Sequence, residues 1–313
     1  MGKRKKISII IPVYYNELNI PITVPRLKEL DKIIHNFDFE FIFVDDGSGD
    51  KSYELLINER NKDKRIKVIK LSKNFGSMSA VQAGLKFATG NCVGIISADL
   101  QDPPELFKDM IAMWEKGNKV VMATRTDRKE SLGQKLFSNT YYFFMNKFAI
   151  KGYPKGGFDF VLIDSQVVKE LNHISEKNTN IMSLIFWLGH DRATIPYVRQ
   201  KREIGKSKWT LSKKIKLFVD SFVAFSYVPI RFMSFIGFLT AFASFIYGIL
   251  IILGTLMGYM SVKGWATLIT FFTFFMGLIM LMLGIIGEYL WRILDETRKR
   301  PSYVIDEAEI DED

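Results

Sequence analysis

The stretch Cys92-Val-Gly-Ile-Ile-Ser-Ala-Asp-Leu-Gln-Asp-Pro-Pro-Glu105 joins an apolar run to an acidic turn and then to a pair of prolines. The apolar run, residues 92–98, is continuous rather than alternating, which is typical of a strand buried on both faces of a parallel sheet. Proline is tolerated in the first turn of a helix, so the pair predicts a helix that begins near residue 104. The stretch therefore indicates an α/β fold in which a strand ends in an acidic turn.

The same alternation of strand and helix recurs along the N-terminal two thirds of the chain. Apolar runs rich in β-branched residues predict four more strands, at 7–13, 39–45, 66–71 and 120–124. The intervening segments predict helices at 18–34, 52–61, 78–89 and 104–115. This order predicts a Rossmann-like, mostly parallel sheet with helices on both faces, and such sheets bind ligands at the carboxyl ends of their strands. The sequence contains neither a G-x-G-x-x-G motif after a strand nor a P-loop motif.

Two long apolar runs follow in the C-terminal third. Residues 232–262 and 264–287 contain no Asp, Glu, Lys or Arg, and each exceeds the roughly 20 apolar residues with which a helix crosses a bilayer. They predict a transmembrane hairpin over 231–292, with spans at about 232–258 and 265–290; two buried helices of a soluble core are the alternative. Basic residues lie outside both ends of the hairpin, whereas its turn holds Lys263 alone. The positive-inside rule then predicts a plasma-membrane (inner-membrane) protein with both termini in the cytoplasm.

Charge and cysteine content narrow the expected partners. The 313 residues have a formal net charge of +9 and one cysteine, Cys92. A single cysteine forms no disulfide within the chain, which agrees with a reducing compartment for the N-terminal part. No nucleic-acid-binding motif accompanies the positive charge, so an anionic membrane surface and phosphorylated ligands are expected in place of nucleic acid.

Two segments flank the predicted hairpin. The apolar stripe of Leu211, Ile215, Phe218 and Phe222 predicts an amphipathic interfacial helix over 206–230. Aromatic residues also gather at 138–148, where a second interfacial helix and ordinary core packing remain alternatives. The acidic tail, within 293–313, is expected to be solvated, disordered and cytoplasmic.

Four motifs occur in a fixed order along the chain. They are Ile11-Pro-Val-Tyr-Tyr-Asn-Glu17, Val44-Asp-Asp-Gly-Ser48, Ser97-Ala-Asp-Leu-Gln-Asp-Pro-Pro-Glu105 and Arg202-Glu-Ile-Gly-Lys-Ser-Lys-Trp209. Together they resemble the motifs of family 2 glycosyltransferases, which have the GT-A fold. The most similar subgroup is the polyprenyl-phosphate glycosyltransferases, which include dolichyl-phosphate mannose synthase and the bacterial undecaprenyl-phosphate glucosyltransferases. The resemblance implies a GT-A catalytic domain over 1–205, and the hairpin is similar to that of the bacterial subgroup.

The resemblance implies a divalent cation, Mg²⁺ or Mn²⁺, bound by Asp99 and Gln101 in a variant of the D-x-D motif. Such a cation neutralises the diphosphate that leaves a nucleotide sugar, and it prefers carboxylate, amide and phosphate oxygens as ligands. Ser97 stands where the family commonly has an aspartate, so a contact to the donor ribose or to the metal stays open there. An acidic turn in which Asp102 caps the next helix is the structural alternative. The other expected nucleotide-sugar contacts are Pro12, Tyr14, Glu17, Asp46 and Gly76.

The resemblance places a second catalytic carboxylate, Asp159, near the reacting centre. General base is the usual role of this residue in the family. A lipid phosphate is already largely dianionic at neutral pH, because its second pKa is about 6; orienting the acceptor or stabilising a positively charged sugar is therefore the alternative. The basic side chains of Arg202, Lys208 and Arg125 are suited to phosphate oxygens.

These features predict an inverting transfer of a sugar from a nucleotide sugar to polyprenyl phosphate. UDP-glucose and UDP-N-acetylglucosamine are the favoured donors, ahead of GDP-mannose. A transferase that uses another lipid acceptor, such as a diacylglycerol, and a nucleotide-sugar binder without catalysis are the alternatives. Small residues in the second span, Gly277, Gly284 and Gly287, favour association into a homo-oligomer.

Overall fold

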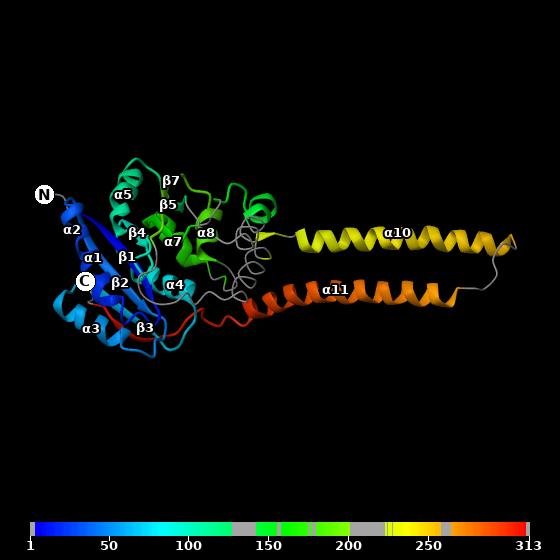
Figure 1. The fold of residues 1–313 in the computed structure, drawn as a ribbon, viewed down its shortest axis with the longest axis horizontal. Coiled ribbons are helices and arrows are strands. Elements are labelled where there is room, and N and C mark those ends of the chain that lie inside the picture. Colours follow the sequence, from blue (N-terminus) through cyan, green and yellow to red (C-terminus); the bar gives the residue numbers. More distant parts are fainter. Residues whose placement is uncertain are drawn as a thin grey trace. The chain divides into compact units, whose positions relative to one another are not determined.

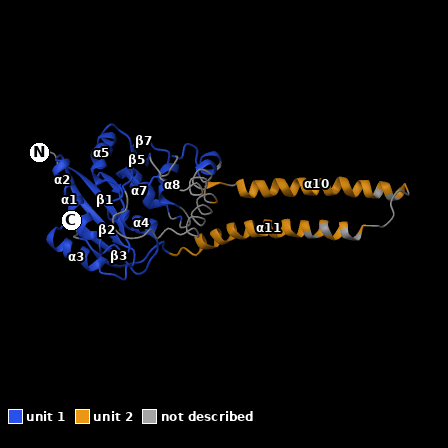
Figure 2. Ribbon diagram, in the orientation of Figure 1, with its two compact units in different colours: residues 1–221, 301–313 blue, residues 222–300 orange. Residues whose placement is uncertain are grey.

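The computed structural model describes residues 4–126, 142–154, 158–174, 176, 180–200, 223, 225–226, 228–257 and 264–310. The chain divides into two compact units (Figure 2). Unit 1 comprises Met1–Ser221 and Pro301–Asp313, and unit 2 comprises Phe222–Arg300. Arg202, Lys208 and most of the predicted interfacial helix at 206–230 lie outside the described residues.

Unit 1 is built on one eight-stranded sheet among the described residues, with the order β7-β5-β6-β4-β1-β2-β3-β8 (Figure 1). Its strands are β1 (Lys5–Val13), β2 (Phe37–Asp45), β3 (Ile66–Leu71), β4 (Cys92–Ile95), β5 (Val120–Arg125), β6 (Phe160–Asp164), β7 (Arg192–Tyr197) and β8 (Ile305–Glu309). Its helices are α1 (Ile20–Lys28), α2 (Leu30–Ile33), α3 (Ser52–Lys62), α4 (Ser77–Phe87), η1 (Pro104–Leu106), α5 (Phe107–Glu115), the π-helical η2 (Met145–Ala149), α7 (Ser165–His173) and α8 (Ile181–Trp187).

The five predicted strands are confirmed as β1 to β5, and the α/β class is confirmed with them. The sheet is mixed. The strand β1 pairs in parallel with β2 and β4, β2 with β3, and β5 with β7. The strand β6 runs antiparallel between β4 and β5, and β8 runs antiparallel along β3. Four of the seven pairings between the described strands are parallel, so the expected mostly parallel sheet is confirmed, and the antiparallel pairings come from β6 and β8, which the sequence did not predict.

Helices cover both faces of the sheet, as the continuous apolar strands require. Ile9 and Ile11 of β1 belong to the core cluster that includes Leu27 of α1, Leu56 of α3 and Phe107 of α5. Ile10, between them in sequence, packs on the opposite face against α4. Alternate side chains of β1 thus enter two apolar layers, and this burial holds the strand ends in fixed positions.

The acidic tail is ordered, so the expectation of disorder is wrong for residues 305–309. The strand β8 covers the edge of β3, where Lys70 Nζ lies 2.7 Å from Glu307 Oε1 and 3.2 Å from Asp306 Oδ2. Tyr53 of α3 also donates a hydrogen bond of 2.9 Å to Glu307. The negative tail finds basic partners and an open row of backbone groups at this edge, which offset the cost of ordering it.

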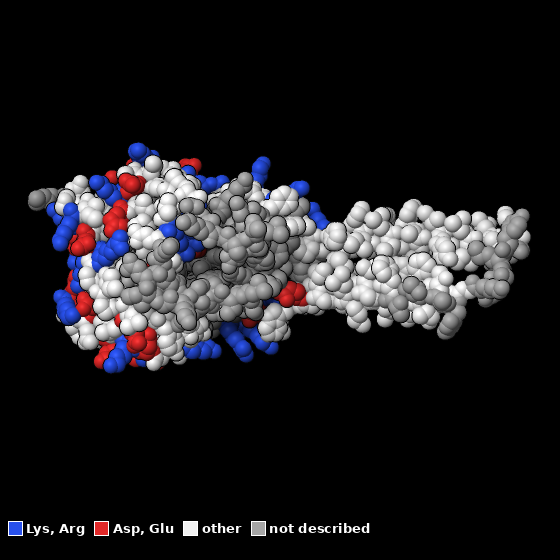
Figure 3. Space-filling view, viewed as in Figure 1, with Lys and Arg blue, Asp and Glu red and all other residues white. Residues whose placement is uncertain are grey.

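Unit 2 consists mainly of α10 (Val228–Leu256) and α11 (Trp265–Thr297), which lie side by side (Figure 1). Tyr247 and Phe271 contact each other across the pair, with ring centroids 6.1 Å apart. The segments Val228–Ile251 and Thr267–Thr297, with mean hydropathies of 2.0 and 2.5, are long and apolar enough to cross a membrane. On the face drawn in Figure 3, charged side chains gather over unit 1 and are almost absent from the two helices.

Candidate active site

The first two motifs meet at one edge of the sheet because β1 and β2 are parallel and in register. Val13, the last residue of β1, lies opposite Asp45, the last residue of β2. Beyond the strands, Asp46 donates its amide to the carbonyl of Val13 at 2.8 Å, and the amide of Tyr15 donates to Ser48 Oγ at 2.9 Å. Glu17 accepts a hydrogen bond of 3.1 Å from the amide of Lys51. The two motifs therefore form one connected surface.

The predicted nucleotide contacts of the first motif, Pro12, Tyr14 and Glu17, are half-buried on that surface. Tyr15 has a φ of 54°, a conformation that costs free energy for a residue with a side chain. Its ring packs edge to face on Tyr14, with centroids 4.7 Å apart. Ring packing and the bond to Ser48 hold this strained turn in place.

Asp46 is almost fully buried and binds backbone on the far side of the edge. Its Oδ1 accepts a hydrogen bond of 2.7 Å from the amide of Phe75, and its Oδ2 accepts one of 2.9 Å from the amide of Gly76. Burial raises the pKa of Asp46 to about 6, although the hydrogen bonds from these two backbone amides lower it. Asp46 thus anchors the loop between β3 and α4, and its role as a nucleoside contact stays a prediction.

Two glycines shape the space around Asp46. Gly47 has a φ of 67°, and a Cβ there would lie 2.4 Å from the carbonyl carbon of Lys73, so only glycine allows the two loops to approach so closely. Gly76 has a φ of 97°, and a Cβ there would meet no described atom within 4 Å. The open space beside Gly76 is consistent with its predicted role in letting a donor approach the backbone.

Asp45 is a residue to which the sequence assigned no role. It is fully buried, and its Oδ1 has no hydrogen-bond partner among the described residues. Burial raises its pKa, and its Oδ2 accepts a hydrogen bond of 3.3 Å from the amide of Ser48. A buried carboxylate oxygen without a donor is costly, which makes Asp45 a candidate for contact with a ligand hydroxyl or base N–H. The signal in the sequence was its place beside Asp46 at the end of a buried strand.

The acidic turn that follows β4 brings three predicted site residues together. Ser97 Oγ lies 2.6 Å from Asp99 Oδ1, and the amide of Gln101 donates to the same oxygen at 3.3 Å. Leu100 has a φ of 51°, so the turn is held in a conformation unfavourable for a leucine. Asp99 and Gln101 are half-buried and project from this single turn.

The donor set of this turn fits a hard divalent cation. The side-chain amide nitrogen of Gln101 donates 3.2 Å to the carbonyl of Gln200, which leaves its oxygen as the atom able to bind a metal. One carboxylate and one amide oxygen are ligands that Mg²⁺ and Mn²⁺ accept, with water and substrate phosphate in the remaining positions. The described residues contain no group of three or more His, Cys, Asp or Glu side chains suited to a metal. Asp99 and Gln101 are therefore a candidate metal site with two protein ligands, in which the phosphates of the nucleotide sugar would supply further ligands.

Asp102, at the end of the same turn, is fully buried and faces inward. It accepts hydrogen bonds from Ser97 Oγ, at 3.2 Å, and from the hydroxyl of Tyr197 at the end of β7. Arg199 Nε lies 3.2 Å from the same carboxylate. Asp102 therefore connects the turn to β7, and the alternative in which it caps the next helix is not supported, because η1 and α5 have no side-chain cap among the described contacts.

Asp159 and Arg125, predicted for the acceptor side, form an ion pair with each other. Asp159 immediately precedes β6 and is exposed, whereas Arg125 ends β5 and is largely buried. The ion pair orients Arg125 toward Asp159. If Arg125 binds a phosphate as predicted, its guanidinium must contact the phosphate and Asp159 together. Arg202 and Lys208 lie outside the described residues, but the fourth motif begins two residues after Gln200. The amide of Gln200 donates 2.9 Å to the carbonyl of Gln101.

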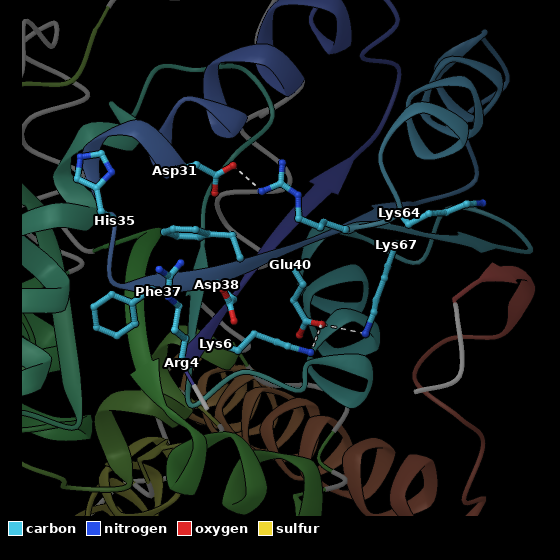
Figure 4. A pocket seen from close by; sticks show the side chains of 11 residues that line it. Arg4, Lys6, Asp31, His35, Phe37, Asp38, Glu40, Lys64 and Lys67 are labelled. Atoms are coloured by element: carbon cyan, nitrogen blue, oxygen red, sulfur yellow. Dashed lines mark hydrogen bonds and ion pairs between the residues drawn. The ribbon is translucent and has the colours of Figure 1, made fainter. Parts of the chain in front are cut away.

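A separate pocket lies at the opposite edge of the sheet, at the amino-terminal ends of β1, β2 and β3 (Figure 4). Its lining is rich in basic residues, but Lys67 Nζ lies 2.9 Å from Glu40 Oε2 and Arg65 pairs with Asp31. Burial disfavours the charge of Glu40, yet hydrogen bonds from Ser8, Thr89 and Lys67 hold its pKa below the ordinary value. None of its lining residues belongs to the four motifs, so this pocket is separate from the candidate active site.

Comparison with known proteins identifies the family. The family model described as glycosyl transferase family 2 matches residues 8–170. An uncharacterized glycosyltransferase, YkcC of Bacillus subtilis (strain 168), is 38% identical and aligns over 98% of this chain and 95% of its own length. A prophage bactoprenol glucosyl transferase homolog of Escherichia coli (strain K12) is 31% identical over 96% of this chain and 98% of its own length.

Among solved structures, a mannosyltransferase from Pyrobaculum calidifontis in complex with GDP-Man and Mn2+ aligns with a TM-score of 0.46 and 15% identity, over 66% of this chain and 59% of its own. The mixed sheet of unit 1, covered by helices on both faces, agrees with the α/β catalytic domain that the four motifs predicted. The chain therefore belongs to glycosyl transferase family 2 and is a glycosyltransferase.

Proposed function

We propose that this glycosyltransferase moves a sugar, with glucose as the favoured one, from a nucleotide sugar to polyprenyl phosphate at the membrane. The observation that carries the proposal is the 31% identity to a prophage bactoprenol glucosyl transferase homolog over 96% of this chain, which includes both apolar helices as well as unit 1. The first three motifs follow the parallel strands β1, β2 and β4 at one edge of the sheet, where they would form the donor site, and the apolar helices would give access to a lipid acceptor.

The membrane assignment rests on the surface of α10 and α11. Their large apolar side chains are exposed in this chain, with Phe238 66% exposed and Phe245 68% exposed. Exposed apolar surface of this extent is rare on proteins in water, whereas lipid contact makes it favourable. The two helices would form a membrane hairpin, and the basic residues outside it would place both termini and unit 1 in the cytoplasm, where nucleotide sugars are made.

The donor would occupy the edge formed by the first three motifs. Its diphosphate would be held against a divalent cation bound by Asp99 and Gln101, and the cation would supply charge neutralisation of the leaving group. The open backbone at Gly76 and the unpaired oxygen of Asp45 would face the nucleoside. Pro12, Tyr14, Glu17 and Asp46 would line or support that part of the site.

The acceptor phosphate would attack the anomeric carbon from the side of Asp159. Since a phosphate monoester is already largely dianionic at neutral pH, its oxygen needs no base to remove a proton. Asp159, exposed and oriented by Arg125, would instead orient the acceptor and stabilise the positive charge that develops on the sugar. Arg202 and Lys208, in the fourth motif, would bind phosphate oxygens, and the sugar would be transferred with inversion.

A transfer assay tests the proposal directly. The purified chain is incubated with undecaprenyl phosphate, Mn²⁺ and, in separate reactions, UDP-glucose, UDP-N-acetylglucosamine or GDP-mannose, and the lipid product is weighed by mass spectrometry. A lipid-phosphate hexose is expected with UDP-glucose. Parallel reactions contain diacylglycerol in place of undecaprenyl phosphate. A product formed only on diacylglycerol would show that the acceptor is a different lipid, and binding of the nucleotide sugar without any product would show that the chain is a binder without catalysis.

A topology experiment tests the membrane assignment separately. A reporter fused after Asp313 should lie in the cytoplasm, and one inserted beside Lys263 should lie outside. The reverse result would contradict the proposed orientation, because unit 1 would then face away from the cytoplasmic pool of nucleotide sugars.

A further inference from the structure

A series of polar contacts, with the buried Asp102 at its centre, joins the turn that carries Asp99 to the ion pair that carries Asp159. The first arm runs from Asp99 to Ser97, whose hydroxyl lies 2.6 Å from Asp99 Oδ1 and 3.2 Å from Asp102 Oδ2. Asp102 is fully buried and also accepts the hydroxyl of Tyr197. The carboxylate of Asp102 thus connects this turn to Tyr197, which lies 95 residues further along the chain.

The second arm starts from the same tyrosine. Tyr197 lies opposite Arg125 in the pairing of β5 with β7, and Arg125 Nε lies 3.5 Å from its hydroxyl. The terminal nitrogen of Arg125 reaches Asp159. The Tyr197 ring also packs edge to face on Phe160, the residue that follows Asp159, with centroids 6.3 Å apart. Tyr197 therefore contacts both Arg125, the partner of Asp159, and the side chain of Phe160, the residue that follows Asp159.

Burial makes this arrangement costly unless every member is paired. A carboxylate with no exposed surface must be stabilised by donors and by opposite charge. Asp102 accepts hydrogen bonds from the hydroxyls of Ser97 and Tyr197, and it forms an ion pair with Arg199, whose Nε makes no hydrogen bond to a described residue. Ser97 Oγ lies within hydrogen-bond distance of both carboxylates, so Asp102 and Asp99 share its single hydrogen. The hydroxyl of Tyr197 is the contact shared by the two arms.

We infer that Asp102 and Tyr197 are positioning residues that hold the cation-binding turn and Asp159 in one fixed geometry. The inference rests on the proposed function, because it assigns Asp99 to the donor and Asp159 to the acceptor. Neither residue contacts a reacting atom. Asp102 acts through Ser97 and Asp99, and Tyr197 acts through Arg125 and Asp159.

The test uses Tyr197→Phe, which removes one oxygen and keeps the ring on Phe160. The full chain is purified in detergent, and Mn²⁺-dependent binding of UDP, with GDP in parallel, is measured by calorimetry for wild type, Ser97→Ala, Tyr197→Phe and the double variant. A second cycle measures kcat and KM of transfer for Tyr197→Phe, Asp159→Asn and their combination. Tyr303→Phe is the matched control, because Tyr303 is buried and its hydroxyl has no partner among the described residues.

Tyr197→Phe is expected to lower kcat on the order of tenfold. The two single effects, as fold-losses in affinity or in kcat, are multiplied to give the loss expected for independent residues. In each cycle the loss in the double variant should be more than about threefold smaller than this product, because both changes disrupt the same set of contacts. Tyr303→Phe should combine multiplicatively with each partner. Tyr197→Phe should unfold at a lower temperature than Tyr303→Phe, because it removes a hydrogen bond to the buried carboxylate of Asp102. A residue that only stabilised the fold would lower that temperature in the same way and leave both cycles multiplicative.

Multiplicative effects within about twofold in both cycles would overturn the inference. A wild type that binds nucleotide with Mn²⁺ but transfers no sugar would overturn the proposed function, while the binding cycle would still decide the coupling between Ser97 and Tyr197. A wild type that binds neither UDP nor GDP would contradict both.

Discussion

Asp46 Oδ2 accepts a hydrogen bond of 2.9 Å from the amide of Gly76, across 30 residues of sequence. The contact fastens the end of β2 to the start of α4 and leaves a carboxylate almost without exposed surface. Because burial raises its pKa, the folded chain holds a proton on Asp46 more tightly than the unfolded chain does. The residue that shapes the donor edge is therefore also a source of pH-dependent stability.

Asp46 should make the chain less stable as pH rises from about 4 to about 7. Its pKa is about 6 when folded against an ordinary 3.8, which corresponds to roughly 3 kcal/mol. The contribution is complete below pH 4, since both states are then protonated, and it is lost as pH rises through 6. Thermal unfolding of wild type and Asp46→Asn across this range should show the difference between them change in that direction.

Asp63→Asn is the control for the Asp46 experiment. Hydrogen bonds from Arg65 lower the pKa of Asp63 to about 2, so its contribution is lost only as pH falls toward 2 and should be constant between pH 5 and 7. A stability difference between wild type and Asp46→Asn that stays flat over the same interval would contradict the burial argument.

Asp99→Asn should abolish most transfer while the fold survives. The change removes one charge from a turn outside the apolar core. It should weaken the binding of a cation that stabilises the leaving diphosphate by several kcal/mol. At about 1.4 kcal/mol per tenfold, transfer should fall on the order of a hundredfold or more. Transfer is measured with Mn²⁺, Mg²⁺ and a chelator, beside Asp109→Asn, an exposed aspartate of α5. A variant that keeps over about a tenth of wild-type activity, or a wild type indifferent to the chelator, argues against the metal site.

Asp159→Asn should lower kcat and leave the KM for the nucleotide sugar unchanged, because the proposed function assigns Asp159 and its partner Arg125 to the acceptor. If Asp159 orients the acceptor, raising the pH should not restore the rate, since no proton transfer is missing. Rate measurements from pH 6 to pH 9 decide the matter. Near-normal activity of the variant at high pH would support the general-base role instead.

The parts of the fold that the sequence predicted are those with buried, continuous apolar runs. The strands β1 to β5 carry that signal, whereas β7, Arg192-Ala-Thr-Ile-Pro-Tyr197, contains a proline that weakens it. The position of β7 at one end of the sheet explains the proline, because an edge strand can lack one donor. The strand β6 is short and lies among polar residues that were assigned to the acceptor site.

The site was predicted as a set of motifs but not as a set of contacts. Spacing in sequence placed Ser97, Asp99 and Gln101 on one turn, and the structure keeps them there. It could not show that Asp102 faces Tyr197, or that Asp159 pairs with Arg125, because these partners come from strands distant in sequence. Contacts of that kind depend on strand order, which includes the unpredicted strands β6 and β7.

Removing β8 should destabilise the chain and expose a sheet edge. A chain that ends at Val304 keeps the hydrogen bond of 2.9 Å that the Ser72 amide donates to the Val304 carbonyl. It loses the antiparallel pairing of β8 with β3 and the contacts of Lys70 and Tyr53 with Glu307. Each exposed ion pair contributes only about 0.2–1 kcal/mol, so most of the loss should come from backbone hydrogen bonds at about 0.5–1.5 kcal/mol each. We therefore expect the thermal unfolding temperature to fall by several degrees and association to increase, since β3 then presents unpaired backbone groups.

Glu307→Gln in the full chain separates the contribution of the ion pair from that of the backbone hydrogen bonds, because it removes the charge and keeps the strand. It should lower the unfolding temperature only slightly, and this difference should disappear at high salt. Truncation with no change in unfolding temperature or in light scattering would show that β8 does not stabilise this edge.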